Sequence, residues 1–223
     1  MKATIREPVT RECAIRVAIA LADAGGLDAL SMRKLANELG IKAMSLYYHV
    51  KNKDDILDGM LDVTYSEFST PHTGGDWREA MRERANSTRA VLSRHPWAIT
   101  MKARTSPGPA TLAHLDAVIG CLRAAGFSMS MTGHTMSILD SYVQGFAQQE
   151  AALPLDPTGD IGAATEEIIA QQESMQEAFP NLADMAATLI LQPGYAYGNE
   201  FAFGLDLILN GIENARAGDT RGQ

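Results

Sequence analysis

The sequence predicts an all-α fold, with a small N-terminal three-helix head followed by a larger helical domain. Glycine and proline clusters divide the chain into segments in which apolar residues recur every three or four positions. These segments are rich in Ala, Leu, Met, Glu and Arg, which are good helix formers. No segment combines two-residue alternation with β-branched residues, so about ten helices and no sheet are expected.

The first helix is expected over residues 10–24. Thr10 is a plausible N-cap, and Gly25 is a plausible stop because glycine tolerates the backbone that ends helices. The apolar stripe of this helix consists of Ile15, Ala18, Ile19 and Ala22.

The next three helices begin at recognisable caps. Ser31 precedes a helix over 32–39, Gly40 permits a sharp turn into a short helix over 42–50, and Asn52 caps the fourth. The fourth and later helices are expected near 54–68, 76–94, 96–103, 108–125, 128–152, 160–177, 181–191 and 197–215.

The charge of the chain is unevenly distributed. The 223 residues carry a net charge of −8, but residues 1–53 carry +4 and residues 54–223 carry −12. A basic head on an acidic body confines attraction for phosphate to the head, although chance could produce so small an excess. We therefore predict two domains, 1–53 and 54–223.

Nothing in the sequence predicts export or membrane insertion. No apolar run approaches the roughly 18 residues of a membrane span, and the polar N-terminus lacks the apolar stretch of a signal peptide. Cys13 and Cys121 lie far apart and suit small core residues in a reducing compartment. A cytoplasmic protein without a membrane partner is expected.

Residues 31–50 fit a helix-turn-helix, in which two short helices cross at a tight turn that often contains glycine. The side chains expected to face outward follow helical spacing, and two are aromatic, which is unusual for a surface without a partner. An ordinary helical hairpin is the alternative. The inner edge consists of Leu35, Leu39, Ile41, Leu46 and Val50, and the outer face of Lys42, Ser45, Tyr48 and His49.

The stretch from Leu30 to Leu57 resembles the tetracycline-repressor (TetR) family, most specifically in its Leu-Tyr-Tyr-His-Val-Lys-Asn-Lys run. Weaker similarity continues through Gly126-Phe-Ser128, Tyr142 to Phe146 and Phe203 to Leu207. The resemblance implies a DNA-binding domain over 1–53 and a ligand-binding and dimerisation domain over 54–223. It further implies a homodimeric repressor on a pseudo-palindromic operator, which a small-molecule inducer releases.

The same resemblance assigns roles in binding double-stranded DNA. Arg33 matches a position that contacts base edges, Lys42 leads the recognition helix, and Ala43 and Ser45 are candidate base readers. Met44 is matched to a thymine methyl group. Tyr47, His49 and Lys53 match phosphate-gripping positions, with Tyr48 beside them. For each residue alone, a surface group without a DNA contact is the alternative.

The last helix is expected to support the dimer through one apolar stripe, although internal core is an alternative for any amphipathic helix. Matching the family also predicts a pocket, and our hypothesis is that ligand binding moves the helix joining head and body. The stripe consists of Phe201, Leu205, Ile208 and Ile212. The pocket residues are Trp97, Met101, Met136, Leu139, Val143, Phe146 and Asp140, the last either a ligand contact or a solvated or interface residue.

The pocket residues favour a largely apolar inducer, and no cofactor is expected. Where the tetracycline repressors place a metal-chelating histidine, this chain has Ile99-Thr-Met-Lys102, and its five histidines lack zinc-ligand spacing. An enzyme is disfavoured because no nucleophile elbow, phosphate loop or zinc-protease motif occurs. A helical scaffold whose head no longer reads DNA is the remaining alternative.

Overall fold

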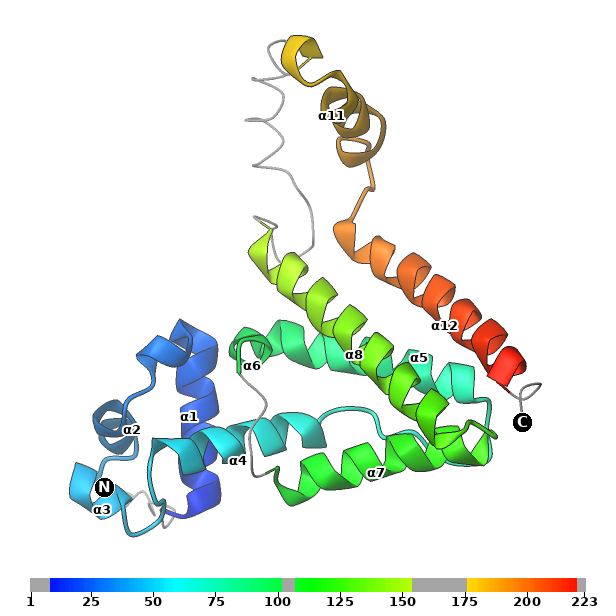
Figure 1. Cartoon of the computed structure of the whole chain (residues 1–223). Coiled ribbons are helices and arrows are strands. Elements are labelled where there is room, and N and C mark those ends of the chain that lie inside the picture. The colour runs from blue at the N-terminus through cyan, green and yellow to red at the C-terminus, as the bar shows by residue number, and fades with distance from the viewer. Residues whose placement is uncertain (1–8, 102–106, 154–175, 220–223) are drawn as a thin grey trace. The chain divides into compact units, whose positions relative to one another are not determined.

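The computed structural model describes residues 9–101, 107–153 and 176–219, and the regular structure within those ranges is entirely helical. This confirms the all-α prediction. The chain divides into two compact units, unit 1 over 1–136 and unit 2 over 137–223, which we describe separately (Figure 1). Unit 1 extends well beyond the three head helices, and the predicted domain boundary at residue 53 stays a prediction.

The head consists of α1 (Arg11–Gly25), α2 (Met32–Glu38) and α3 (Ala43–Leu46), with the short 3-10 helix η1 (Leu27–Ala29) after α1. The predicted caps form: the Thr10 side chain accepts from the Cys13 N–H, and the Ser31 side chain accepts from the Lys34 N–H. Helix α3 is shorter than the predicted 42–50. After Leu46 the backbone closes into turns, with the Tyr48 and His49 N–H groups bonding three residues back.

Helix α4 (Lys53–Ser66) begins at Asn52, whose side chain accepts from the Asp55 N–H. It packs on α1 at Gly59, where an added Cβ would overlap the Ile15 side chain. The glycine therefore permits the two helices to approach closely. The buried side chains of the head and α4 form one core, which consists of Ala14, Ile15, Ala18, Ala22, Leu30, Leu35, Ala36, Leu46, Val50, Ile56 and Met60.

The rest of unit 1 is built from α5 (Trp77–Arg94), α6 (Pro96–Ile99), α7 (Pro109–Ala124) and the first turns of α8 (Met129–Ala152). Gly126, at φ +88°, supplies the left-handed turn between α7 and α8. Trp77 and Phe127 meet edge to face with ring centroids 4.8 Å apart. Helix α6 has one turn and ends before the predicted residue 103, which lies outside the described residues.

Unit 2 contains the remainder of α8, α11 (Pro180–Met185), the π-helical turn η2 (Ala186–Ile190), the 3-10 turn η3 (Tyr197–Asn199) and α12 (Glu200–Asp219). Aromatic side chains join α8 to α12. The Tyr142 ring stacks on Phe201 at 5.3 Å, and its hydroxyl donates to the Phe201 carbonyl at 3.0 Å. Phe146 stacks on Tyr197 at 4.9 Å. The helix predicted over 160–177 falls almost wholly outside the described residues.

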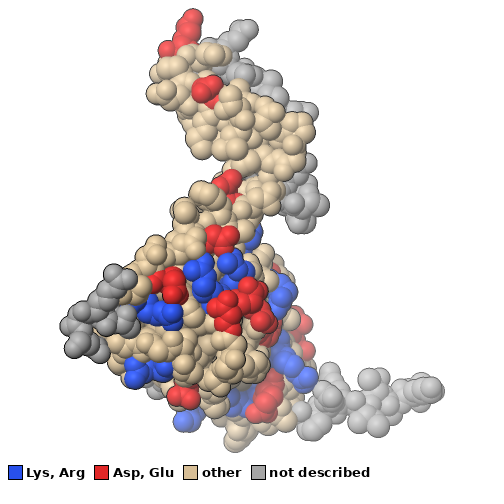
Figure 2. All heavy atoms as spheres, turned by 90° about the vertical axis from the view of Figure 1, so that its right-hand side faces the viewer, with Lys and Arg blue, Asp and Glu red and all other residues tan. Residues whose placement is uncertain are grey.

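The two units differ in charge. Residues 137–223 contain thirteen Asp and Glu but two Arg and no Lys, for a net charge of −11, which leaves +3 for residues 1–136. On the face drawn in Figure 2, blue and red groups lie interleaved over the lower part, whereas the part that includes α11 carries scattered red groups. The acidity of the body is therefore concentrated in unit 2.

Candidate nucleic-acid interface

The outer surface of α3 and the turns after it is strongly exposed. Tyr48 is 88% exposed, Met44 76% and Tyr47 47%, while Leu46 between them is fully buried. The same short segment thus anchors itself through Leu46 and Val50 and presents large apolar groups to solvent. Of the residues predicted to contact DNA, Ala43 and Ser45 are half-buried, and the exposed ones are Arg33, Lys42, Met44, Tyr47, Tyr48, His49 and Lys53.

The turn between α2 and α3 holds this surface in place. Gly40 lies at φ +67°, a conformation that favours glycine, and the Ile41 N–H donates to the Ala36 carbonyl at 3.0 Å. Leu35 and Ala36 on α2 are fully buried, so the turn closes against the head core. The expected helix-turn-helix geometry is therefore present, with a recognition helix of about one turn followed by turns through His49.

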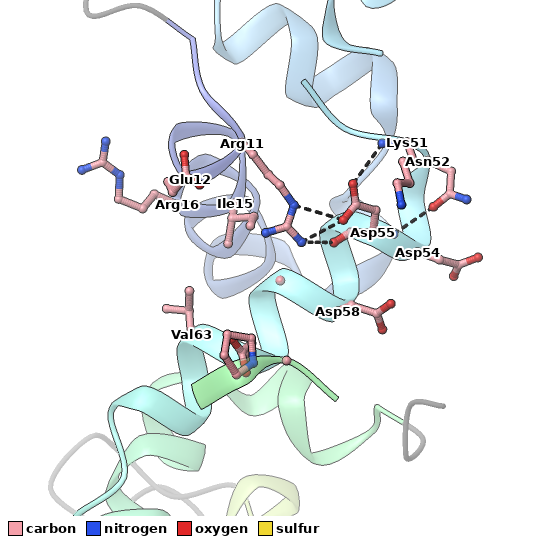
Figure 3. A pocket seen from close by; sticks show the side chains of 14 residues that line it. Arg11, Glu12, Ile15, Arg16, Lys51, Asn52, Asp54, Asp55, Asp58 and Val63 are labelled. Atoms are coloured by element: carbon pink, nitrogen blue, oxygen red, sulfur yellow. Dashed lines mark hydrogen bonds and ion pairs between the residues drawn. The ribbon is translucent and has the colours of Figure 1, made fainter. Parts of the chain in front are cut away.

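Asp55 connects three parts of this surface (Figure 3). Its Oδ1 accepts from the Arg11 Nε and Nη2 at 3.1 and 2.8 Å, and its Oδ2 accepts from the Lys51 N–H at 3.0 Å. Partial burial raises the pKa of the Asp55 carboxyl, but the hydrogen bonds and charges of Arg11 and Lys51 outweigh it and hold that pKa below its usual value. Asp55 thus ties the start of α1 and the turn after the recognition helix to α4.

A groove of about 790 Å³ lies beside this connection, between the beginnings of α1, α4 and α7 (Figure 3). Its walls combine cationic groups of α1 and the turn before α4 with a row of acids along α4. Figure 3 labels, among these wall residues, Arg11, Arg16, Lys51, Asp54, Asp55 and Asp58. Because the groove is lined by both basic and acidic side chains, its electrostatic potential does not favour an anion throughout. We therefore assign no ligand to the groove.

The predicted pocket residues are divided between the units. Trp97, Met101 and Met136 belong to unit 1, where Trp97 is buried and the two methionines are half-buried. The Trp97 Nε1 donates to Asp23 Oδ1 on α1 at 2.6 Å. In unit 2, Asp140 is half-buried, and Leu139, Val143 and Phe146 are buried. That these seven residues line one cavity therefore stays a prediction.

The residues of the predicted dimer stripe differ in burial, and their role in a dimer stays a prediction. Phe201, Leu205 and Ile212 are buried within the single chain, Phe201 against the α8 aromatics Tyr142 and Phe146. Side chains buried inside one chain have little surface left for a second copy, which favours the internal-core alternative for these three. Ile208 is half-buried. The exposed apolar residues of α12 are instead Phe203 and Leu207, at 65% and 58%.

A set of buried polar side chains in unit 1 was not predicted. Arg84 on α5 is buried and its Nε donates to His114 Nε2 at 3.1 Å, while the His114 ring meets Tyr65 and Phe68 edge to face. His114 follows the helical spacing of its buried neighbours on α7, which was a usable signal. Arg84 likewise follows the helical spacing of Trp77, Met81 and Ala85 on α5, so the same signal was present there. The other buried polar residues of the unit are Thr64, His95, Thr111, Thr132 and Thr135.

The fold and the exposed helix-turn-helix define a helical DNA-binding regulator. Family models agree: "Bacterial regulatory proteins, tetR family" matches residues 14–60, and "Tetracyclin repressor-like, C-terminal domain" matches residues 70–216. The chain belongs to the TetR family of transcriptional regulators. The predicted function of a ligand-responsive transcriptional repressor of the TetR type is thereby confirmed at the level of the family.

Individual relatives span most of the chain. The transcriptional repressor DrrR1 of Streptomyces coeruleorubidus is 31% identical over 92% of this chain and 77% of its own length. The class A tetracycline repressor from transposon 1721 of Escherichia coli is 28% identical over 92% of this chain and 95% of its own. The crystal structure of Streptomyces coelicolor ActR with actinorhodin has a TM-score of 0.77 at 27% identity, covering 94% and 97% of the two chains.

None of the helices in the described ranges has the length and apolar character that spanning a bilayer requires. Within the same ranges, no three His, Cys, Asp or Glu side chains converge as a candidate metal site.

Proposed function

We propose that the chain is a homodimeric repressor that binds a pseudo-palindromic operator and is released from it by a largely apolar small molecule. The observation that carries the proposal is the pairing of buried Leu46 with exposed Met44, Tyr47 and Tyr48 on one short segment. Exposed aromatic groups on a rigid, buried base are costly to leave in water without a partner. A major groove offers them base edges, methyl groups and phosphates.

The residues divide into two roles in this proposal. Arg33 reads a guanine, Ala43 and Ser45 read bases, and Met44 contacts a thymine methyl. Lys42 begins the recognition segment. Tyr47, His49 and Lys53 hold the phosphate backbone, with Tyr48 beside them, and these contacts set register without reading sequence.

Two heads must be held about one DNA turn apart, roughly 34–36 Å or a multiple of it, to read two half-sites. We assign the dimer contact to the exposed side of α12, around Phe203 and Leu207, with half-buried Ile208 beside it. Two large apolar groups one helical turn apart form a self-complementary surface across a two-fold axis.

Release requires that the inducer prefer the conformation that does not bind DNA. The structure of ActR with actinorhodin and that of an Acinetobacter baumannii TetR variant with minocycline are of family members with small molecules bound. By analogy, we propose that the helices after α4 receive the inducer of this chain. The relatives are regulators, so we propose regulation without catalysis.

The test is binding of the purified protein to the DNA flanking its own gene, at 50 and 200 mM salt. We expect saturable binding to one palindromic site, and we expect the affinity to fall by about a thousandfold between the two salts because neutralised phosphates release counterions. Tyr48→Ala should weaken binding at least about tenfold, a change of roughly 1.4 kcal/mol, without changing stability.

Leu46→Ala is the matched contrast on the same segment. Leu46 is fully buried, so its truncation should cost about 2–5 kcal/mol of unfolding free energy in urea titrations. Equal loss of unfolding free energy in the two variants would contradict the assignment of Leu46 to the buried core and Tyr48 to the DNA contact. No site-specific DNA binding, from flanking DNA or from a random-sequence pool, would favour a helical scaffold.

A further inference from the structure

The N-terminus of α7 is capped by a side chain from another helix. Its own N-cap position is Gly108, which has no side chain, and Pro109 has no N–H. The carboxylate of Asp62 on α4 takes the place of a cap: Oδ1 accepts from the Thr111 N–H at 2.8 Å and from the Thr111 hydroxyl at 2.9 Å. Its Oδ2 accepts from the Ala110 N–H at 3.4 Å. These are the N–H groups that a local cap would satisfy.

Gly108 is required for this arrangement because of space, not backbone strain. Its φ of −78° suits any residue, but a Cβ at this position would overlap the carboxylate of Asp62. The negative charge lies at the N-terminal turn of α7, where the partial positive charge of the helix end stabilises it. Asp62, Gly108 and Pro109 are also among the lining residues of the groove described above.

A second carboxylate joins α1 to the short helix α6. Asp23 Oδ1 lies 2.7 Å from His95 Nδ1 and accepts from the Trp97 Nε1–H at 2.6 Å. Both rings are buried, and their centroids lie 5.7 Å apart. The other ring nitrogen of His95 faces Glu67, the residue that ends α4, at 3.5 Å. Helix α6 is therefore held by the head on one side and by α4 on the other.

We infer that Asp62 and Asp23 are positioning residues that transmit changes at α6 and at the start of α7 to the DNA-binding head. Each carboxylate accepts two or more directional hydrogen bonds, and hydrogen bonds to charged groups are the strong ones. A shift of Trp97 or Thr111 must therefore either move α1 and α4 or break these bonds. The inference rests on the proposed function, since it supplies the coupling between an inducer and the operator.

Coupling between two sites is reciprocal, so DNA alone is a sufficient probe. The experiment measures amide hydrogen exchange in peptides covering 109–114 and 96–101, with and without the double-stranded fragment selected above. For the wild type, we expect DNA to slow exchange about fivefold in both peptides, the lower end of typical coupling. In Asp62→Ala, the 109–114 peptide should exchange at one rate with and without DNA, and in Asp23→Ala the 96–101 peptide should do so.

Two further variants separate positioning from stability. Gly108→Ala leaves Asp62 in place but displaces its carboxylate, so it should reproduce Asp62→Ala even if that variant folds poorly. Asp58→Asn is the control, because Asp58 lies one turn earlier on α4 and lines the same groove. It should retain the wild-type response to DNA.

The outcomes distinguish this inference from the proposed function. Wild-type binding to DNA with no change of exchange in either peptide would overturn the inference and leave the function standing. A DNA response in Asp62→Ala and Gly108→Ala equal to that of the wild type would also overturn it. Absence of any DNA binding by the wild type would overturn both.

Discussion

At the scale of single residues, the head depends on a few polar side chains that each satisfy several backbone groups. Asn52 caps α4, and Asp55 in the first turn of α4 accepts from Arg11 and from the Lys51 N–H. These bonds hold the turn that follows the recognition segment, so their loss affects both the stability of the head and the position of Tyr47 to His49. The carboxylate form of Asp55 is the one that makes them.

Asp55→Asn tests the contribution of that charge. The folded-state pKa of Asp55 is lowered, so its contribution to stability is present above the unfolded pKa of about 3.9 and is lost as the pH falls through the lower, folded pKa. We expect the variant to be less stable than the wild type by about 1 kcal/mol at pH 7. Urea titrations should find this difference shrinking below about pH 4. A difference that stays constant down to pH 3 would contradict the assignment.

At the scale of elements, glycines decide where two helices can approach each other closely. Helix α12 meets Tyr142 of α8 at Gly204, where an added Cβ would overlap the ring that stacks on Phe201. The hydroxyl of that ring is also fixed by its bond to the Phe201 carbonyl. The glycine is thus part of the contact, although glycine inside a helix normally costs stability.

Gly204→Ala and Gly120→Ala form a matched pair in helix interiors. At Gly120 on α7 an added Cβ has nothing within 4 Å, so alanine should stabilise the protein by about 0.5–1 kcal/mol. At Gly204 the same change should destabilise it by about 1–3 kcal/mol, because the buried aromatic cluster must shift. Thermal unfolding of both variants measures the two signs. Stabilisation by both substitutions would contradict this expectation, because it would show that the Tyr142 ring can shift without loss of unfolding free energy.

At the scale of the whole molecule, net charge differs between the two units, and exposed apolar side chains differ between the two sides of α12. Unit 2 carries a net charge of −11, so the attraction to DNA must come from unit 1, which carries the helix-turn-helix. The apolar groups of α12 are divided between a buried side, which includes Leu205 and Leu209, and an exposed side with Phe203 and Leu207. A repressor that reads a palindrome needs such a surface for its second copy.

Leu207→Glu should therefore dissociate the proposed dimer, because like charges would face each other across the two-fold axis in an apolar contact. Sedimentation should detect a monomer at micromolar concentration, with operator affinity reduced at least about tenfold. Leu112→Glu is the control, since Leu112 on α7 is similarly exposed, at 53%, and lies outside the proposed contact. If the Leu207→Glu protein remained a dimer, the dimer interface would lie outside the exposed side of α12.

The sequence by itself determined the features that depend on neighbours along the chain. Helical periodicity, the caps at Thr10, Ser31 and Asn52, and the glycine turn at Gly40 all act within a few residues, and the structure contains each of them. Of the outer face predicted from the same local spacing, Lys42, Tyr48 and His49 are exposed, whereas Ser45 is half-buried. Met44 and Tyr47, which that spacing left out, are also exposed.

Only the tertiary structure decided which face of a helix meets which neighbour. An amphipathic stripe reads the same whether it is covered by the chain itself or by a second copy, so the sequence could not separate the buried Phe201, Leu205 and Ile212 from exposed Phe203 and Leu207. The carboxylate bridges from Asp62 to α7 and from Asp23 to α6 join residues about 48 to 74 positions apart. The local sequence pattern does not predict such pairs, because these residues come together only when the helices pack.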